Sequence, residues 1–278
     1  MKKKRHEIIF CSSSECPVIV CQRRDNASHS TLAYHREWEF QFILKGKGFY
    51  FIAGKKYAFR PNTVFAINPD HVHYYALTPG YMMWKWTLMF LPAILRDLSL
   101  KRALSAIPHQ VPLTDLESAA VVLLLCRLKN ELSRQEAHWR EIVSLKLEEF
   151  LWLLKRAGGR TSPMPVVSPL AKQLTDYIEQ HFTQDFSVPE LAERFGYSEG
   201  YLAHVFKRHT QFGIKHYLLQ RRIVEARRQL EENPRMKTAS VAENVGFKDF
   251  GVFNRMFKLL VGITPAVYSR NSHLNSSI

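Results

Sequence analysis

The sequence of 278 residues predicts a two-domain α+β fold: a β-sandwich or barrel, two following helices, and an all-α C-terminal domain. Residues 31–90 contain short apolar or aromatic segments separated by glycine and proline turns, which is typical of an all-β domain. Helix-start signals replace this pattern near residue 112. After residue 168 no strand-like alternation recurs, and a repeat with helical periodicity appears instead.

The β domain is predicted over residues 1–112. Residues 37–42 (EWEFQF) alternate polar and aromatic side chains, as expected of a half-buried strand. Further short apolar segments lie between closely spaced turn residues: Gly46, Gly48, Gly54, Pro61, Pro69 and Pro79. Many short strands with regular turns favour a sandwich or a barrel.

A helical pair is predicted next, over residues 113–158. Thr114 and Glu117 have the spacing of a capping box, which opens the first apolar helix. The second helix, residues 138–156, leads to the glycines at 158–159. Because glycine adopts positive φ at little cost, we expect a left-handed C-cap there.

A linker and a helical domain complete the chain. Residues 159–168 contain two prolines and no periodicity, so they are predicted to form the linker. The helical domain, residues 169–270, opens with Ser168-Pro169 as N-cap and first position, and includes one long helix over residues 214–232. A short tail, residues 271–278, ends the chain.

Composition excludes several classes of protein. Hydrophobic residues make up 46% and charged residues 23%, values of an ordinary globular protein. The apolar run at 121–126 is too short to cross a membrane, and the basic N-terminus lacks the apolar core of a secretory signal. We therefore expect a cytoplasmic protein with no membrane association. Three of the four cysteines are spaced C-x4-C-x4-C, which is not the spacing of a zinc site, so we expect reduced thiols.

The net charge of +14 suits a polyanionic partner. However, residues 168–278 carry 15 lysines and arginines against 11 acidic residues, so most of the excess lies outside the helical domain. Charge alone therefore supports nucleic-acid binding only weakly, and sequence pattern has to decide.

The C-terminal domain contains two copies of one pattern, offset by 50 residues before a central turn and by 51 after it. Each copy has an apolar residue followed by alanine, a glycine followed by an aromatic residue, a Phe-Lys pair and a final tyrosine. The first copy has Leu191-Ala192, Gly196-Tyr197, Phe206-Lys207 and Tyr217, and the second has Val241-Ala242, Gly246-Phe247, Phe257-Lys258 and Tyr268.

Each copy has the features of a helix-turn-helix unit, predicted over residues 188–209 and 238–260. The small alanine lets two helices cross closely, and the glycine ends the first helix in the left-handed region. The second helix then presents its outward face to base edges in the major groove. Lys207 and Lys258, beside the anchoring phenylalanines, are expected to contact phosphates. Two matching copies favour a DNA-binding domain over a simple helical bundle.

Residues about 170–270 resemble the DNA-binding domain of AraC/XylS-type transcription regulators. The resemblance lies in both copies of the pattern and in the closing GITP and tyrosine at residues 262–268. It implies sequence-specific binding of double-stranded DNA. By position, it places the base-contacting sites at Gly200, Ala203, His204, Phe250, Gly251, Asn254 and Arg255. Of these, Arg255 can bind guanine and Asn254 can bind adenine.

Three positions depart from the pattern of this family. Gln211 stands where glycine is usual, Thr238 where an apolar residue is usual, and Lys248 in place of a small N-cap residue. The first departure leads us to expect an altered turn after the second helix of the first unit.

Residues about 30–90 resemble, more loosely, the cupin-like sensor domain found ahead of this DNA-binding domain. The resemblance lies in residues 42–48 (FILKGKG) and 69–75 (PDHVHYY). It implies a cupin-like barrel whose mouth binds a small effector, with a sugar as one candidate. The expected contacts are Arg36, Trp38, Phe40, Phe42, His73, Trp84 and Trp86. The alternative, that these aromatic residues belong to the barrel core, stays open.

A metal site is not expected in the barrel. Metal-dependent cupins use a His-x-His pair with a glutamate and a further histidine. His71 and His73 form such a pair, but no glutamate follows within five residues. We therefore interpret both histidines as turn or pocket residues, and expect no cofactor, no metal and no catalytic residue.

The helices of residues 113–158 carry apolar faces, and in this family the equivalent helices commonly form a dimer, so we expect a homodimer. The favoured hypothesis is an effector-responsive transcription regulator. Two alternatives remain open: a metal-dependent cupin enzyme with a helical appendage, and a small-molecule binding module with no role in DNA binding.

Overall fold

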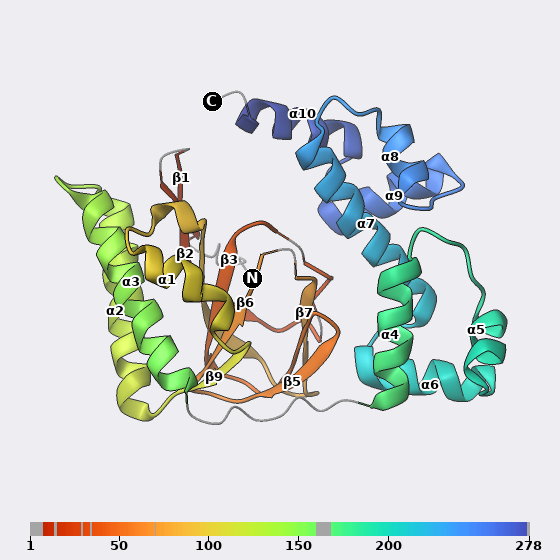
Figure 1. Ribbon diagram of the computed structural model, residues 1–278, viewed down its shortest axis with the longest axis horizontal. Coiled ribbons are helices and arrows are strands. Elements are labelled where there is room, and N and C mark those ends of the chain that lie inside the picture. Colours follow the sequence, from red (N-terminus) through yellow and green to blue (C-terminus); the bar gives the residue numbers. More distant parts are fainter. Residues whose placement is uncertain are drawn as a thin grey trace.

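The computed structural model describes residues 8–13, 16–28, 30–33, 35–69, 71–159 and 168–276. A pair of long helices, a β-barrel and a helical C-terminal domain lie in this order from left to right in Figure 1. The predicted two-domain α+β fold is confirmed.

Two antiparallel sheets form the barrel. The strands are β1 (Ile8–Ser13), β2 (Cys16–Asp25), β3 (Trp38–Lys45), β4 (Gly48–Ile52), β5 (Lys55–Phe59), β6 (Thr63–Ile67), β7 (His73–Leu77), β8 (Met83–Phe90) and β9 (Gln110–Pro112). The larger sheet has the order β1-β2-β8-β3-β6-β9 and the smaller sheet has the order β5-β4-β7. Sequence analysis missed β1 and β2, although residues 17–21 (PVIVC) are apolar and rich in valine and isoleucine.

Period-2 alternation gives the larger sheet two different faces. On β3, Trp38, Phe40 and Phe42 join the core cluster that the sheet shares with the helical pair. Glu39 and Gln41, between them, are buried on the opposite face, which looks into the barrel. The sheet therefore has an aromatic face under the helices and a partly polar face toward the barrel interior.

The helical pair consists of α2 (Asp115–Arg134) and α3 (Trp139–Gly158). The predicted capping box is confirmed, since Thr114 accepts from the Glu117 N–H while the Glu117 carboxylate accepts from the Thr114 N–H. The predicted left-handed C-cap is wrong, because Gly159 has φ −67°. Close packing explains Gly158 instead: an added Cβ would lie 2.9 Å from Cδ of Pro108. Along the chain, the short helices η1 (Pro92–Ile94), α1 (Leu98–Ala103) and η2 (Leu104–Ala106) connect β8 to β9.

The described residues of the C-terminal domain form helices joined by short loops and contain no strand. Its helices are α4 (Pro169–His181), α5 (Val188–Phe195), α6 (Glu199–Thr210), α7 (Ile214–Glu232), α8 (Thr238–Asn244), α9 (Phe250–Val261) and α10 (Pro265–Ser276). The long helix α7 has the predicted bounds. The predicted domain end at residue 270 falls inside α10. No helix in the described ranges combines the length and the apolar character needed to cross a membrane.

The barrel and the C-terminal domain share a hydrophobic core. Phe51 and Tyr74 of the smaller sheet belong to the same cluster of buried residues as Phe212 and Tyr217. The Tyr74 ring lies 5.1 Å from the Phe212 ring. The first half of the C-terminal domain is therefore packed against the barrel.

Candidate DNA interface and effector pocket

In the first helix-turn-helix unit, α5 and α6, capping residues mark both ends of α5 and the start of α6. Ser187 and Glu190 form a complete capping box at the start of α5. Gly196 ends α5 in the left-handed conformation, with φ 72°. Ser198 then accepts from the Tyr201 N–H at 3.3 Å and begins α6. Gly196 therefore ends the first helix in the left-handed region, as the sequence predicts.

The second unit, α8 and α9, turns at Gly246, which has φ 93°. Asp249 accepts from the Val252 N–H at 2.7 Å and is the N-cap of α9. The helix start that the sequence indicates at Asp249 is therefore confirmed, and Lys248 does not replace the N-cap. Lys248 lies one position earlier, where its ammonium is 2.6 Å from the carboxylate of Asp185.

The outward faces of α6 and α9 hold the side chains expected to contact DNA. Leu202 and Phe206 of α6 are fully buried, as are Phe253 and Phe257 of α9, so the opposite faces point to solvent. Asn254 is half-buried, and the remaining residues of the expected interface are exposed: Gly200, Ala203, His204, Lys207, Phe250, Gly251, Arg255 and Lys258. The DNA-binding hypothesis requires His204 and Arg255 to face solvent, and both side chains are exposed.

Tyr201 extends the α6 face and was missed by sequence analysis. Its side chain is 52% exposed, and its ring lies 5.3 Å from the ring of Tyr197. The signal was its spacing, since Tyr201 precedes His204 by three positions and so shares its helix face.

The barrel lies next to the C-terminal half of α6. Lys56, at the start of β5, donates to the backbone carbonyl of Arg208 at 3.4 Å. The Phe51 ring lies 6.2 Å from the ring of His209. Lys56 and His204 line the same surface pocket, of about 490 Å³. One end of the expected DNA-contacting helix is thus in reach of the barrel.

Gln211 follows α6 and takes the backbone conformation that favours glycine, with φ 67°. Its side-chain amide donates to the carbonyl of Arg208 at 3.0 Å. The backbone turn is therefore left-handed in spite of the substitution, and the altered turn that we expected is not observed.

A polar cavity of about 280 Å³ lies inside the barrel, and we call it the barrel pocket. It is lined by Arg23, Asp25, Ser30, Thr31, Ala33, His35, Glu39, Gln41, Tyr50, His73, Tyr74, Tyr75 and Lys85. A chain of hydrogen bonds crosses it: Lys85 donates to the Tyr50 hydroxyl, Tyr50 to the Gln41 carbonyl, and the Gln41 amide to Glu39. Such a lining favours a small polar ligand.

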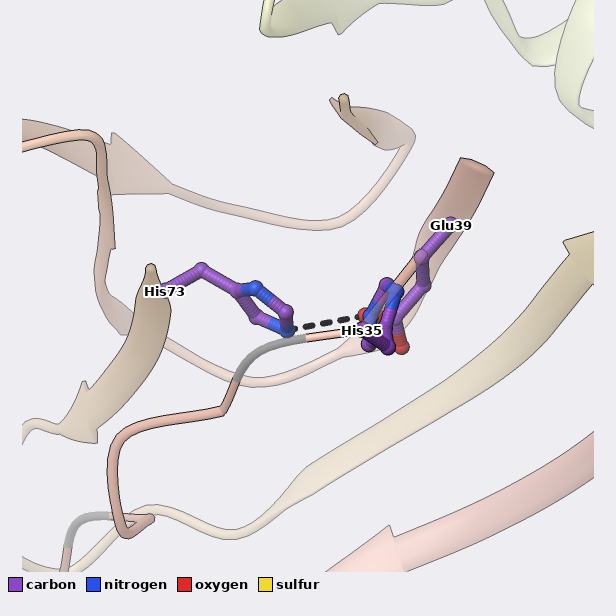
Figure 2. Close-up of side chains that lie close together, drawn as sticks. All are labelled: His35, Glu39 and His73. Atoms are coloured by element: carbon purple, nitrogen blue, oxygen red, sulfur yellow. Dashed lines mark hydrogen bonds and ion pairs between the residues drawn. The ribbon is translucent and has the colours of Figure 1, made fainter. Parts of the chain in front are cut away.

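Three of the side chains that line the barrel pocket lie close together, those of His35, Glu39 and His73 (Figure 2). Nε2 of His35 and Nε2 of His73 each lie 2.9 Å from the same oxygen, Oε2 of Glu39. His73 comes from the start of β7, Glu39 from β3, and His35 from the segment before β3. The described residues contain one group of three donor side chains close enough to hold a metal ion, and it is this triad.

The triad perturbs its own ionisation. Burial alone would raise the pKa of the Glu39 carboxyl, but the hydrogen bonds from His35 and His73 hold that pKa well below its usual range. Burial opposes the charged form of His35, yet the bond and charge of Glu39 raise the pKa of its imidazole. Burial lowers the pKa of Lys85 against the attraction of Asp25 and Glu39. Perturbed groups gathered in a cavity are typical of a functional site.

Only one of the residues expected to contact the effector lines the barrel pocket, namely His73. Trp38, Phe40, Phe42 and Trp86 belong to the core between the larger sheet and the helical pair. The expected pocket position is therefore wrong for these four residues, because alternation along β3 and β8 directs them to the sheet face under the helical pair. The alternative interpretation, that they belong to the core, is confirmed.

The other two expected effector contacts also lie elsewhere. Trp84 is half-buried beneath the guanidinium of Arg24, which lies 4.5 Å from its ring. Arg36 is exposed and pairs with Glu232 of α7 at 3.3 Å. The pocket residues that sequence analysis missed, such as Glu39 and Gln41, are the polar members of the same alternating strand.

Two family descriptions match this chain. The AraC-like ligand binding domain matches residues 17–154, and a helix-turn-helix domain matches residues 191–271. The arabinose operon regulatory protein of Escherichia coli is 23% identical over 238 residues, which cover 81% of this chain and 77% of that protein. The Msm operon regulatory protein of Streptococcus mutans is 29% identical over 103 residues, or 37% of each chain.

Among solved structures, ToxT of Vibrio cholerae O395 is 10% identical and aligns over 93% of this chain and 98% of its own, with a TM-score of 0.39. This TM-score is low, so the description of the fold depends on the strands and helices of this chain and not on the similarity to ToxT.

Proposed function

The chain is an AraC-family transcription regulator with a ligand-binding domain and a helix-turn-helix DNA-binding domain, and from that premise we propose that a small polar effector in the barrel pocket controls its binding to specific DNA sequences. The observation that carries the DNA-binding part is the exposure of His204 on α6 and Arg255 on α9, each on the face opposite a buried pair of core residues. We propose that α6 and α9 enter successive major-groove segments about one helical turn apart.

The lining of the barrel pocket supports a polar effector. Arg23, Asp25 and Lys85 supply charge, and Tyr50 and Tyr75 supply hydroxyl groups. A volume of about 280 Å³ lies at the small end of ligand pockets, so a molecule of the size of a monosaccharide suits it. A sugar remains one candidate, held here by polar groups more than by aromatic stacking.

A short segment connects the barrel pocket to the DNA-binding domain. Ser30, Thr31 and Ala33 line the pocket, while the Leu32 N–H between them donates to the buried side-chain carbonyl of Gln220 on α7 at 2.8 Å. An effector that touches this segment therefore has a direct route to α7, which joins the two helix-turn-helix units. We propose this contact as the route of regulation.

The helical pair supports the proposal of a homodimer. Large apolar side chains remain exposed on both helices: Leu116 and Leu123 on α2, and Leu145 and Trp152 on α3. Pairing of two copies through this surface would place two DNA-binding domains on repeated half-sites.

Selection of bound sequences from random DNA tests the function. We expect the full chain to enrich one motif, and a candidate monosaccharide or other small polar molecule to shift its affinity. A Gln220→Leu variant, which removes the acceptor for Leu32, should bind the same motif with a weaker response to the effector. Equal binding to all DNA sequences would contradict sequence-specific regulation, and absence of DNA binding would favour the small-molecule binding module.

A further inference from the structure

The two histidines of the triad are held in the same way, each by a backbone carbonyl oxygen at Nδ1. Nδ1 of His35 lies 2.9 Å from the carbonyl oxygen of Glu37, and Nδ1 of His73 lies 2.9 Å from the carbonyl oxygen of His71. A carbonyl oxygen can only accept, so each Nδ1 carries a hydrogen. A neutral imidazole has one N–H, so in a neutral ring Nε2 presents a lone pair to its neighbour, and only an imidazolium donates from Nε2.

Both lone pairs point at one carboxylate oxygen. Oε2 of Glu39 also offers only lone pairs, yet it lies 2.9 Å from each Nε2. Three electron-rich atoms approach this closely only if positive charge lies among them. In one arrangement each ring binds an extra proton, which places two imidazolium ions in a cavity that also contains Arg23 and Lys85. In the other, a single cation binds all three atoms and both rings stay neutral.

The surroundings match those of a metal site. Histidines that bind a metal through Nε2 usually donate Nδ1–H to a backbone carbonyl or carboxylate, which fixes the ring. Both His35 and His73 do so. The remaining oxygen of the carboxylate, Oε1, accepts from the Gln41 amide, so Oε2 is the atom left for a ligand.

The distances fit a first-row cation. Two donor atoms that each lie about 2.1 Å from one ion, at angles between a right angle and a tetrahedral one, are separated by about 3.0 to 3.4 Å. The observed Nε2–Oε2 separations of 2.9 Å need only a small opening, and all three donor atoms lie within 4.8 Å of one another.

We propose that His35, Glu39 and His73 bind one divalent transition-metal cation of the Zn²⁺ class through the two Nε2 atoms and Oε2. Two imidazole nitrogens with one carboxylate oxygen suit such ions, whereas Ca²⁺ and Mg²⁺ prefer oxygen ligands alone. Three protein ligands leave at least one coordination position, and the barrel pocket that the triad lines provides space for a further ligand. The bound ion is thereby able to accept a donor atom from a small polar ligand.

Metal titration of the full-length chain without an affinity tag tests this site. The protein is treated with a chelator, desalted and titrated with Co²⁺ and then Zn²⁺. We expect one Co²⁺ per chain with visible d–d absorption, and its displacement by one Zn²⁺. Glu39→Gln and His73→Gln should each weaken the affinity by at least about 100-fold, more than the loss of an orienting partner costs.

His109→Gln is the matched control. His109 belongs to the same barrel and its Nδ1 lies 2.7 Å from the carbonyl of Ala66, but it lies outside the triad. This variant should keep the affinity of the wild type. Equal affinity in the wild type, Glu39→Gln and His73→Gln would overturn the site.

X-ray absorption of the zinc-loaded wild type provides a test that does not depend on whether the variants fold. Two imidazole nitrogens with oxygen in the first shell support the triad. Sulfur in that shell, or a thiolate-to-cobalt charge-transfer band, would place the ion on cysteines and overturn the proposal. DNA is absent from all of these measurements, so failure of the proposed regulatory function would leave their outcome unchanged.

Discussion

The two helix-turn-helix units come from one repeated pattern, but they are supported differently. The first unit shares its core with the barrel, since Phe51 and Tyr74 lie in the same cluster as Leu191 and Leu202. The second unit has a separate core, formed by α7 to α9 with Tyr268 of α10 packed against it. One repeated pattern therefore occurs in two settings: a unit whose core is shared with the barrel, and a unit whose core is separate from it.

Their turns differ as well. An added Cβ at Gly196 would meet nothing within 4 Å, whereas one at Gly246 would lie 2.4 Å from the carbonyl oxygen of Thr183. Arg222 explains this crowding, because it donates to the carbonyls of Phe182 and Gln184 and so holds that loop against the second turn. The first glycine is needed for its backbone angle, and the second for its angle and for space.

Alanine substitution at the two turn glycines should separate these causes most strongly. Gly196→Ala should cost about 1 kcal/mol of unfolding free energy, the usual cost of a left-handed alanine. Gly246→Ala adds a collision with backbone, so we expect on the order of 3 kcal/mol in total. Urea denaturation followed by circular dichroism measures both. Equal losses would show that the contact with Thr183 is easily relieved.

The outward faces should differ in how they distinguish bases. Arg255→Ala in the second unit should weaken binding to the selected DNA by on the order of 1–3 kcal/mol and relax one base position, because arginine can donate two hydrogen bonds to guanine. Lys258→Ala, the control, should weaken binding to all sequences alike. Fluorescence anisotropy on matched and single-base-changed duplexes measures both effects. An equal loss on every duplex for Arg255→Ala would refute its assigned role.

Exchanging the residues that follow α6 and α9 should give the smallest effect. Gln211 and Gly262 occupy the same place in the two units, and both have positive φ. Gly262→Gln should lower the unfolding free energy by about 1 kcal/mol, since glutamine pays the left-handed penalty. Gln211→Gly should raise it by less than about 1 kcal/mol, because relief of that penalty is offset by the greater freedom of glycine in the unfolded chain. Thermal unfolding of both variants checks the signs, and a loss for Gln211→Gly would show that its bond to Arg208 dominates.

Much of the C-terminal domain could be predicted from sequence because its signals are local. The start of α5 depends on Ser187 and Glu190, and its end depends on Gly196, all within ten residues of one another. The exposed faces of α6 and α9 follow from the positions of their buried residues. Prediction was less complete at the N-terminus, where β1 pairs with β2 and β2 joins the sheet by pairing with the distant β8.

By itself the sequence determined the capped start of α2, the glycine turns of the repeat, and the fact that Trp38, Phe40 and Phe42 share one face of a strand. Only the tertiary structure decided which face the helical pair covers, and therefore that Glu39 points into the barrel. It also brought His73 to Glu39 from a strand more than thirty residues away, so no search for a glutamate close behind the His-x-His pair could find the triad. The physical reason is range: caps and turns are made by neighbours along the chain, whereas the choice between the two faces of a sheet depends on which distant segments pack against each face.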